Sequence, residues 1–189
     1  HPRVRRQRQM CIRDRLLAAH CAPVLKNRKT ANMFHIERDR FHDLAALLRT
    51  YQQKLSQKGI DFALFQAECP RVTVFVYQQR RLSLLLQRSD IQAFLSDYGY
   101  PSGALSAILQ HLDHRLSLCE SYPHEIGIFL GFPLYDVIGF IEQRRCLLQG
   151  YWNVYRYPQA ARRLFALYDR CIRELQAGLY GGSCLEQLI

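Results

Sequence analysis

The chain of 189 residues has no hydrophobic run near the roughly 18 residues that a membrane-spanning helix needs, so no membrane partner is expected. It has neither GxGxxG nor GxxxxGK[ST], which removes the loop signatures of dinucleotide and nucleoside triphosphate binding. No two cysteines have CxxC spacing, so neither a zinc ribbon nor a thioredoxin-type site is indicated. Internal repeats and low-complexity linkers are also absent. With 49% hydrophobic residues, the composition is typical of a packed globular protein.

The first fifteen residues differ from the rest. The string RRQRQMCIRDR at residues 5–15 is what the codons of a transposase-end sequencing adapter encode, and the preceding HPRV also fits an adapter. We therefore predict that residues 1–15 are translated adapter and exclude them from the fold. The alternative is a basic arm for nucleic acid or membrane. Residues 1–15 hold six arginines and one aspartate, so the rest of the chain has 20 basic and 15 acidic residues. Its net charge is then +5 instead of +10, and this charge does not support a nucleic-acid partner.

The remaining length suits one domain. We predict a single globular domain over residues 16–177 and a frayed C-terminal tail over residues 178–189. The cysteines outside the adapter-like segment lie far apart within apolar patterns, so we expect reduced thiols, no disulfides and a cytoplasmic location. They are Cys21, Cys69, Cys119, Cys146, Cys171 and Cys184.

Hydrophobic periodicity predicts a mixed α/β (α+β) fold, with several amphipathic helices around a small sheet. Apolar residues at helical spacing predict helices over residues 41–55, 105–116, 134–141 and 158–175. Runs rich in β-branched and aromatic residues predict paired strands at 61–66 and 71–77. We also expect a buried strand at 126–130 and another strand at 151–155.

A first candidate site is the stretch that contains His20 and Cys21, followed by Lys26 and Lys29. A thiol near a histidine and several cations can have a lowered pKa, which a nucleophile or a metal-binding thiolate needs. The alternative is a small buried cysteine before a turn at Pro23.

A second candidate is the pair His124 and Glu125, because histidine titrates near neutral pH and a carboxylate can fix its tautomer. The alternative is a histidine bonded to backbone at a strand entrance. The turn at Gly131 could hold an anion on free N–H groups. Asp136 falls in the first turn of the next helix, where a carboxylate favours the helix dipole.

Aromatic residues gather at residues 151–157, where Trp152 and Tyr155 could stack a flat ligand. The alternative is that about half of them fill the core, since neighbouring residues of a strand face opposite sides.

Six stretches follow one another along the chain: HCAPVL, KTANMF, VFVY, PHEIGIFLGFPLYDVIGFIE, GYWNVY and ARRLFALYDRC. Together they resemble the bacterial family called domain of unknown function 3793, over about residues 19–171. The resemblance implies that the shared pattern includes His20, Cys21, Pro23, Asn32, His124, Glu125, Gly131, Pro133, Asp136, Gly139, Trp152 and Tyr155. The family has no established activity, so the resemblance leaves both the activity and any cofactor unknown.

Three functions remain open. The first is an interaction module for a small ligand or a protein. The second is a thiol-dependent enzyme or redox protein in which Cys21 is the nucleophile, His124 its base, and Glu125 or Asp136 the orienting acid. The third is a metal-binding accessory protein that uses His20, Cys21, His124 and Glu125.

Overall fold

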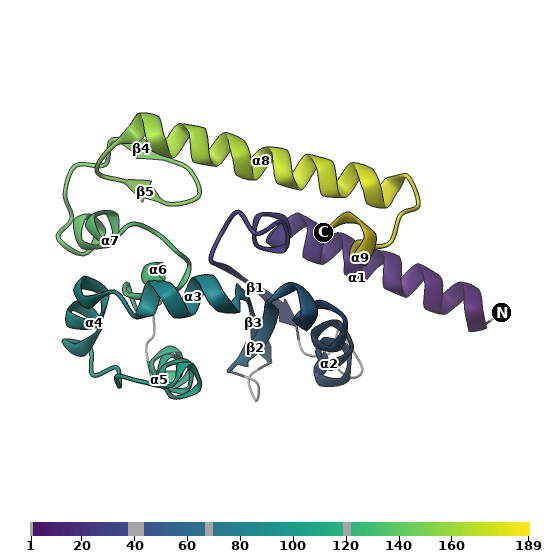
Figure 1. Cartoon of the computed structure of the whole chain (residues 1–189), viewed down its shortest axis with the longest axis horizontal. Coiled ribbons are helices and arrows are strands. Elements are labelled where there is room, and N and C mark those ends of the chain that lie inside the picture. The colour runs from purple at the N-terminus through teal and green to yellow at the C-terminus, as the bar shows by residue number, and fades with distance from the viewer. Residues whose placement is uncertain (1, 38–43, 67–69, 119–121) are drawn as a thin grey trace.

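A three-stranded antiparallel sheet lies near the centre of the molecule in the computed structural model, which describes residues 2–37, 44–66, 70–118 and 122–189 (Figure 1). Its strands are β1 (Ala31–Glu37), β2 (Ile60–Phe65) and β3 (Arg71–Gln78), in the order β1-β3-β2. β3 is the central strand, and it is buried from Val72 to Gln78. The predicted pairing of the segments 61–66 and 71–77 is confirmed.

The two faces of the sheet carry separate parts of the core, because successive side chains of a strand point to opposite sides. Val72, Val74 and Val76 of β3 belong to one apolar cluster. Phe75 and Tyr77 belong to another, on the opposite face. The sheet is therefore covered on both sides.

One face is covered by α1 (Pro2–Leu25) and α2 (Leu44–Leu55), which continues into the 3-10 helix η2 (Ser56–Lys58). The long α8 (Pro158–Tyr180) runs beside α1, and the short α9 (Leu185–Leu188) packs near them (Figure 1). Buried side chains of α1 and α8 lie in the same cluster, including Cys21, Cys171 and Leu175.

The other face is covered by helices from the middle of the chain: α3 (Gln79–Leu86), α4 (Ser89–Ser96), α5 (Leu105–Leu118), α6 (Ile126–Phe129) and α7 (Leu134–Ile141). A small hairpin of β4 (Leu148–Gln149) and β5 (Asn153–Val154) follows. It packs on the first turns of α8 through Trp152, Val154, Ala161 and Tyr168. The fold is thus mixed α+β, as predicted.

Two predicted strands need correction. Residues 126–129 form the buried helix α6, and the amide groups of this segment donate to carbonyl groups three or four residues back. A short apolar run bounded by turns fits a buried helix as well as a strand. Of residues 151–155, only Asn153 and Val154 form a strand. The helices predicted over 105–116, 134–141 and 158–175 are present, as is the 44–55 part of 41–55; residues 41–43 lie outside the described ranges.

The C-terminal segment differs from the predicted frayed tail. α8 continues to Tyr180, and α9 follows with Leu185 completely buried in the core. The side chains of Cys184 and Gln187 form a capping box at the start of α9. Lys58 of η2 donates to the carbonyl of Glu186 over 2.9 Å, which ties α9 to the sheet side of the molecule.

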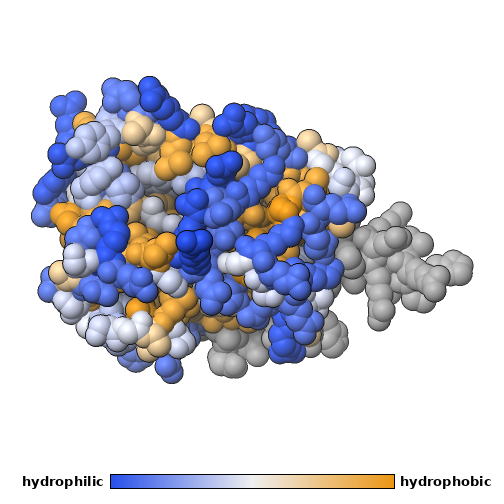
Figure 2. All heavy atoms as spheres, in the orientation of Figure 1, coloured by the Kyte–Doolittle hydropathy of each residue, from blue (hydrophilic) through white to orange (hydrophobic). Residues whose placement is uncertain are grey.

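In the ranges that the structure describes, no helix combines the length and apolar character of a bilayer span. On the face shown in Figure 2, hydrophobic residues are visible in several separate places between hydrophilic ones. Cys21, Cys146, Cys171 and Cys184 are free thiols, whereas Cys69 and Cys119 lie outside the described residues.

Candidate functional site

A pocket of about 440 Å³ opens between α6, α7 and the β4–β5 hairpin. Its volume is in the range of small-molecule sites, and its walls are mainly apolar and aromatic. The lining consists of Tyr122, Pro123, His124, Ile126, Gly127, Phe132, Asp136, Val137, Phe140, Gly150, Trp152 and Asn153. Two segments that the sequence singled out, 123–142 and 151–155, therefore build one pocket.

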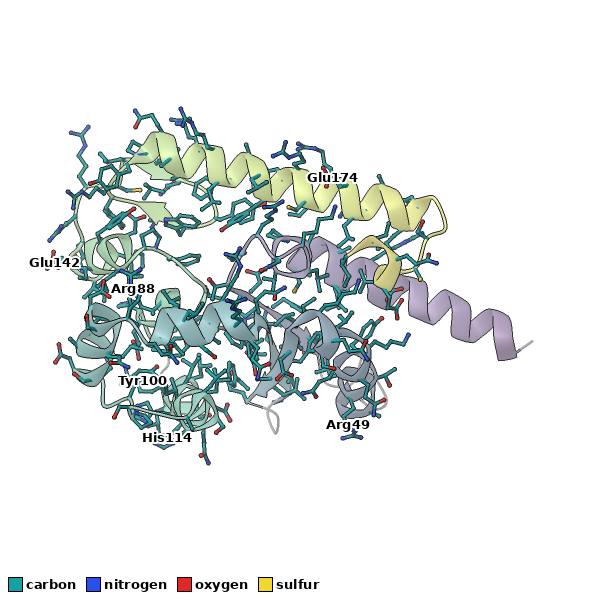
Figure 3. The ribbon with its side chains drawn as sticks, viewed as in Figure 1. Arg49, Arg88, Tyr100, His114, Glu142 and Glu174 are labelled. Carbon is teal, nitrogen blue, oxygen red and sulfur yellow. The ribbon has the colours of Figure 1, made fainter. Side chains whose placement is uncertain are left out.

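His124 and Glu125 do not act as a pair. The exposed His124 ring lines the pocket and stands edge-on to Phe140, with ring centroids 5.1 Å apart. The Glu125 side chain is only 1% exposed and accepts from Arg115 Nε over 2.8 Å and from the Tyr100 hydroxyl over 3.2 Å. Tyr100 comes from the loop between α4 and α5 (Figure 3). Glu125 thus joins that loop and α5 to the start of α6, and it does not orient His124.

Asp136 holds the hairpin segment against α7. Its carboxylate accepts from Trp152 Nε1 over 2.8 Å, from the Tyr155 amide over 2.7 Å and from the Arg156 amide over 3.2 Å. The side chain is 3% exposed, so water does not replace these donors. The carboxylate was predicted to favour the helix dipole, but its main contacts are with a segment that begins sixteen residues later.

Of the two aromatic residues predicted to stack a ligand, Trp152 lines the pocket and Tyr155 does not. Trp152 stacks on Phe132 with ring centroids 5.0 Å apart, and both line the pocket. Tyr155 is not part of the lining and packs on Gly139, where an added Cβ would lie 2.6 Å from Tyr155 Cγ. Gly139 therefore allows the close approach of the hairpin to α7.

The N-terminal motif reaches this region through Lys29 and Thr30. Lys29 Nζ donates to Asn32 Oδ1 over 2.7 Å and lies 5.4 Å from the centroid of the Phe132 ring. Gly131 has φ +81°, and a Cβ there would lie 2.7 Å from Thr30 Oγ1. The two motifs are thus in contact behind the pocket wall. The predicted anion site at this turn is not formed by Gly131 and Phe132, whose amides donate to backbone carbonyl groups.

Cys21 lies apart from the pocket. It is completely buried in the core cluster of α1, and burial raises the pKa of its thiol, while Lys29 opposes this in part. A nucleophilic thiolate would need a lowered pKa, so the observed burial agrees with the alternative of a small buried cysteine. His20 is exposed and stacks on Phe34, and Lys26 pairs with Glu174 over 2.7 Å. Within the described ranges, no three His, Cys, Asp or Glu side chains are placed to hold a metal ion.

Three site residues have no signal in the sequence. Phe140, at the pocket rim, is one of several apolar residues in α7 and differs from the others only by facing outward. Arg115 and Tyr100 reach Glu125 from 10 and 25 residues away, so only the tertiary fold reveals the cluster.

Lys29 makes the stability of the protein depend on pH. Burial lowers the pKa of Lys29 from 10.5 to about 8, and Cys21 opposes this in part. Between pH 8 and 10.5 the unfolded chain then binds more protons, so the contribution of Lys29 to stability rises with pH in this window. From pH 7.5 to pH 10, we expect the free energy of unfolding of wild type to rise by about 2–3 kcal/mol relative to that of Lys29→Met. Urea denaturation of the two proteins at several pH values measures this difference. Parallel stability curves for the two proteins would contradict this prediction.

The fold and the site define a small α+β protein with an aromatic-lined surface pocket that one continuous part of the chain, residues 122–153, builds. The chain belongs to the family described as "Protein of unknown function (DUF3793)", whose model matches residues 17–189. No curated protein and no solved structure matches the chain. The family match does not include residues 1–15, and their interpretation as adapter stays a prediction.

Proposed function

We propose that the protein is a cytoplasmic binding module whose pocket receives an apolar, ring-sized group of a small ligand. The observation that carries this proposal is the composition of the pocket, where Phe132, Phe140, Trp152 and Tyr122 supply aromatic surface. Phe140 and Tyr122 are 43% and 41% exposed at its mouth, an arrangement that leaves apolar area available to a ligand.

Binding fits the site better than thiol catalysis. A nucleophilic thiolate needs solvent access and a lowered pKa, whereas Cys21 is buried with a raised pKa. Its proposed base, His124, lines a pocket that does not include Cys21. The carboxylates are also occupied, since Glu125 and Asp136 each accept several hydrogen bonds inside the fold. What remains accessible is mainly the apolar wall.

The single tryptophan of the chain allows a direct test, because Trp152 lines the pocket. The probe is N-phenyl-1-naphthylamine, a neutral and apolar fluorophore that accepts energy from tryptophan. We expect saturable energy transfer with one probe per chain. Phe140→Ala should weaken binding about ten-fold, since an aromatic contact contributes about 1–1.5 kcal/mol beyond buried area.

Leu84→Ala is the matched control, because Leu84 is an exposed apolar residue of α3 outside the pocket. It should leave the affinity for the probe unchanged. The proposal fails if wild type shows no saturable transfer, or if the two variants bind the probe equally well.

A further inference from the structure

A second pocket, of about 510 Å³, lies on the other side of the molecule's core, where the end of α1 meets α8, α9 and η2. It differs from the aromatic pocket in being rich in charged side chains. Its charged lining side chains are those of Lys26, Arg28, Lys58, Arg170 and Glu174. Four lining side chains are cationic, and Glu174, labelled on α8 in Figure 3, is the acidic one.

Lys26, Arg28, Arg170 and Cys171 line the same pocket. Burial raises the pKa of the Cys171 thiol, Glu174 adds to this shift, and the charges of Lys26, Arg28 and Arg170 oppose it. Glu174 already pairs with Lys26 over 2.7 Å. Within the described ranges, no carboxylate pairs with Arg28 or Arg170. Two guanidinium groups are therefore available to an anion at the pocket.

The turn that carries Lys26 and Arg28 is held in place. Asn27 adopts the left-handed region with φ 53°, which asparagine tolerates better than most residues. Arg81 donates to Asn27 Oδ1 over 2.6 Å and to its carbonyl over 2.7 Å. The Arg28 amide donates to the carbonyl of Pro23 over 2.7 Å. The backbone beneath the cations is thus fixed before any ligand arrives.

We propose that this cationic pocket is a binding site for a small molecule that bears a phosphate group, with Arg28 and Arg170 as its main contacts. Arginine presents its N–H groups in a fork that matches phosphate oxygens, and such charge-assisted bonds are stronger than neutral ones. The phosphate offsets the excess of positive charge in the lining. The site is independent of the aromatic pocket, because the two share no lining residue.

Calorimetric titration with pyrophosphate and with inorganic phosphate, at constant ionic strength set by chloride, tests this site. We expect saturable binding of pyrophosphate with one site per chain, and weaker binding of inorganic phosphate. The double variant Arg28→Gln/Arg170→Gln should lower the affinity for pyrophosphate by about ten-fold or more. Glu174→Gln should raise it, because this change removes the acidic side chain from the lining.

A double variant with the same change of net charge, Arg49→Gln/Arg145→Gln, is the control, since both arginines are exposed and lie outside the pocket. It should bind pyrophosphate as wild type does. Equal loss of affinity in the two double variants, weaker binding by Glu174→Gln, or no saturable binding by wild type would each overturn the proposal. The neutral aromatic probe tests only the aromatic pocket, and the anions test only the cationic pocket. A negative result with one probe therefore does not change the interpretation of the other.

Discussion

Replacement of Asp136 by alanine is expected to destabilise the protein by about 3–5 kcal/mol, one of the largest effects of any single change. The reason is that Trp152 Nε1, the Tyr155 amide and the Arg156 amide all donate to this buried carboxylate. Each donor left without an acceptor in a buried place costs about 1–3 kcal/mol. Urea denaturation followed by circular dichroism measures the loss, and Trp152 fluorescence reports whether the hairpin has moved.

Two further variants separate this effect from a general loss of charge. Asp136→Asn keeps one oxygen for the backbone amides but turns an N–H₂ group toward Trp152 or the amides, so about half of the loss is expected. Asp169→Ala removes a carboxylate that accepts from Tyr151 over 2.8 Å at an exposed position, and it should cost less than about 1 kcal/mol. If Asp136→Ala is no more destabilising than Asp169→Ala, the carboxylate does not hold the hairpin.

Glu125→Ala is the second change with a large expected effect, about 2–4 kcal/mol. It removes a carboxylate that is 1% exposed and leaves Arg115 and the Tyr100 hydroxyl without their shared acceptor. Because the Arg115 side chain is 30% exposed, the ion pair is only partly buried, but removing one partner still costs more than replacing both by apolar residues. The double variant Arg115→Met/Glu125→Met is therefore expected to recover a large part of the stability lost in Glu125→Ala.

Thermal and urea denaturation of the three proteins test this expectation. His124→Ala serves as the neighbouring control, because its exposed ring contacts Phe140 at the surface and should contribute less than about 1 kcal/mol. A loss in Glu125→Ala that matches the loss in His124→Ala would show that Glu125 is not the centre of the cluster.

Much of the fold could be predicted because its elements show their own periodicity. The VTVFVY run of β3 alternates between the two core clusters, and the α5 and α8 stripes recur at helical spacing. Residues 126–130 could not be assigned correctly, since a five-residue apolar run is too short to show a period that separates strand from helix. The C-terminal segment was missed because the burial of Leu185 depends on α1 and α8, which lie far away in the sequence.

The candidate site was predicted in part. Residues 123–142 and Trp152 were identified, and they do meet in one pocket. Which of these side chains contact one another was not predictable. His124 and Glu125 are adjacent in sequence but face different surroundings, whereas Asp136 and Trp152 are sixteen residues apart and share a hydrogen bond. The same is true of Cys21, because its burial in the cluster shared with α8 raises the pKa of its thiol more than Lys29 lowers it.

The packing of α8 along α1 has a consequence for synthesis on the ribosome. Leu17, Ala18 and Cys21 of α1 are buried together with Cys171 and Leu175 of α8, and Lys26 bonds to Glu174 across 148 residues. Contacts between such distant segments form only after the intervening chain has been made. The sheet and α2 can cover part of the apolar side of α1 early in synthesis, but the part that faces α8 stays without its partner until residues 158–180 have been made.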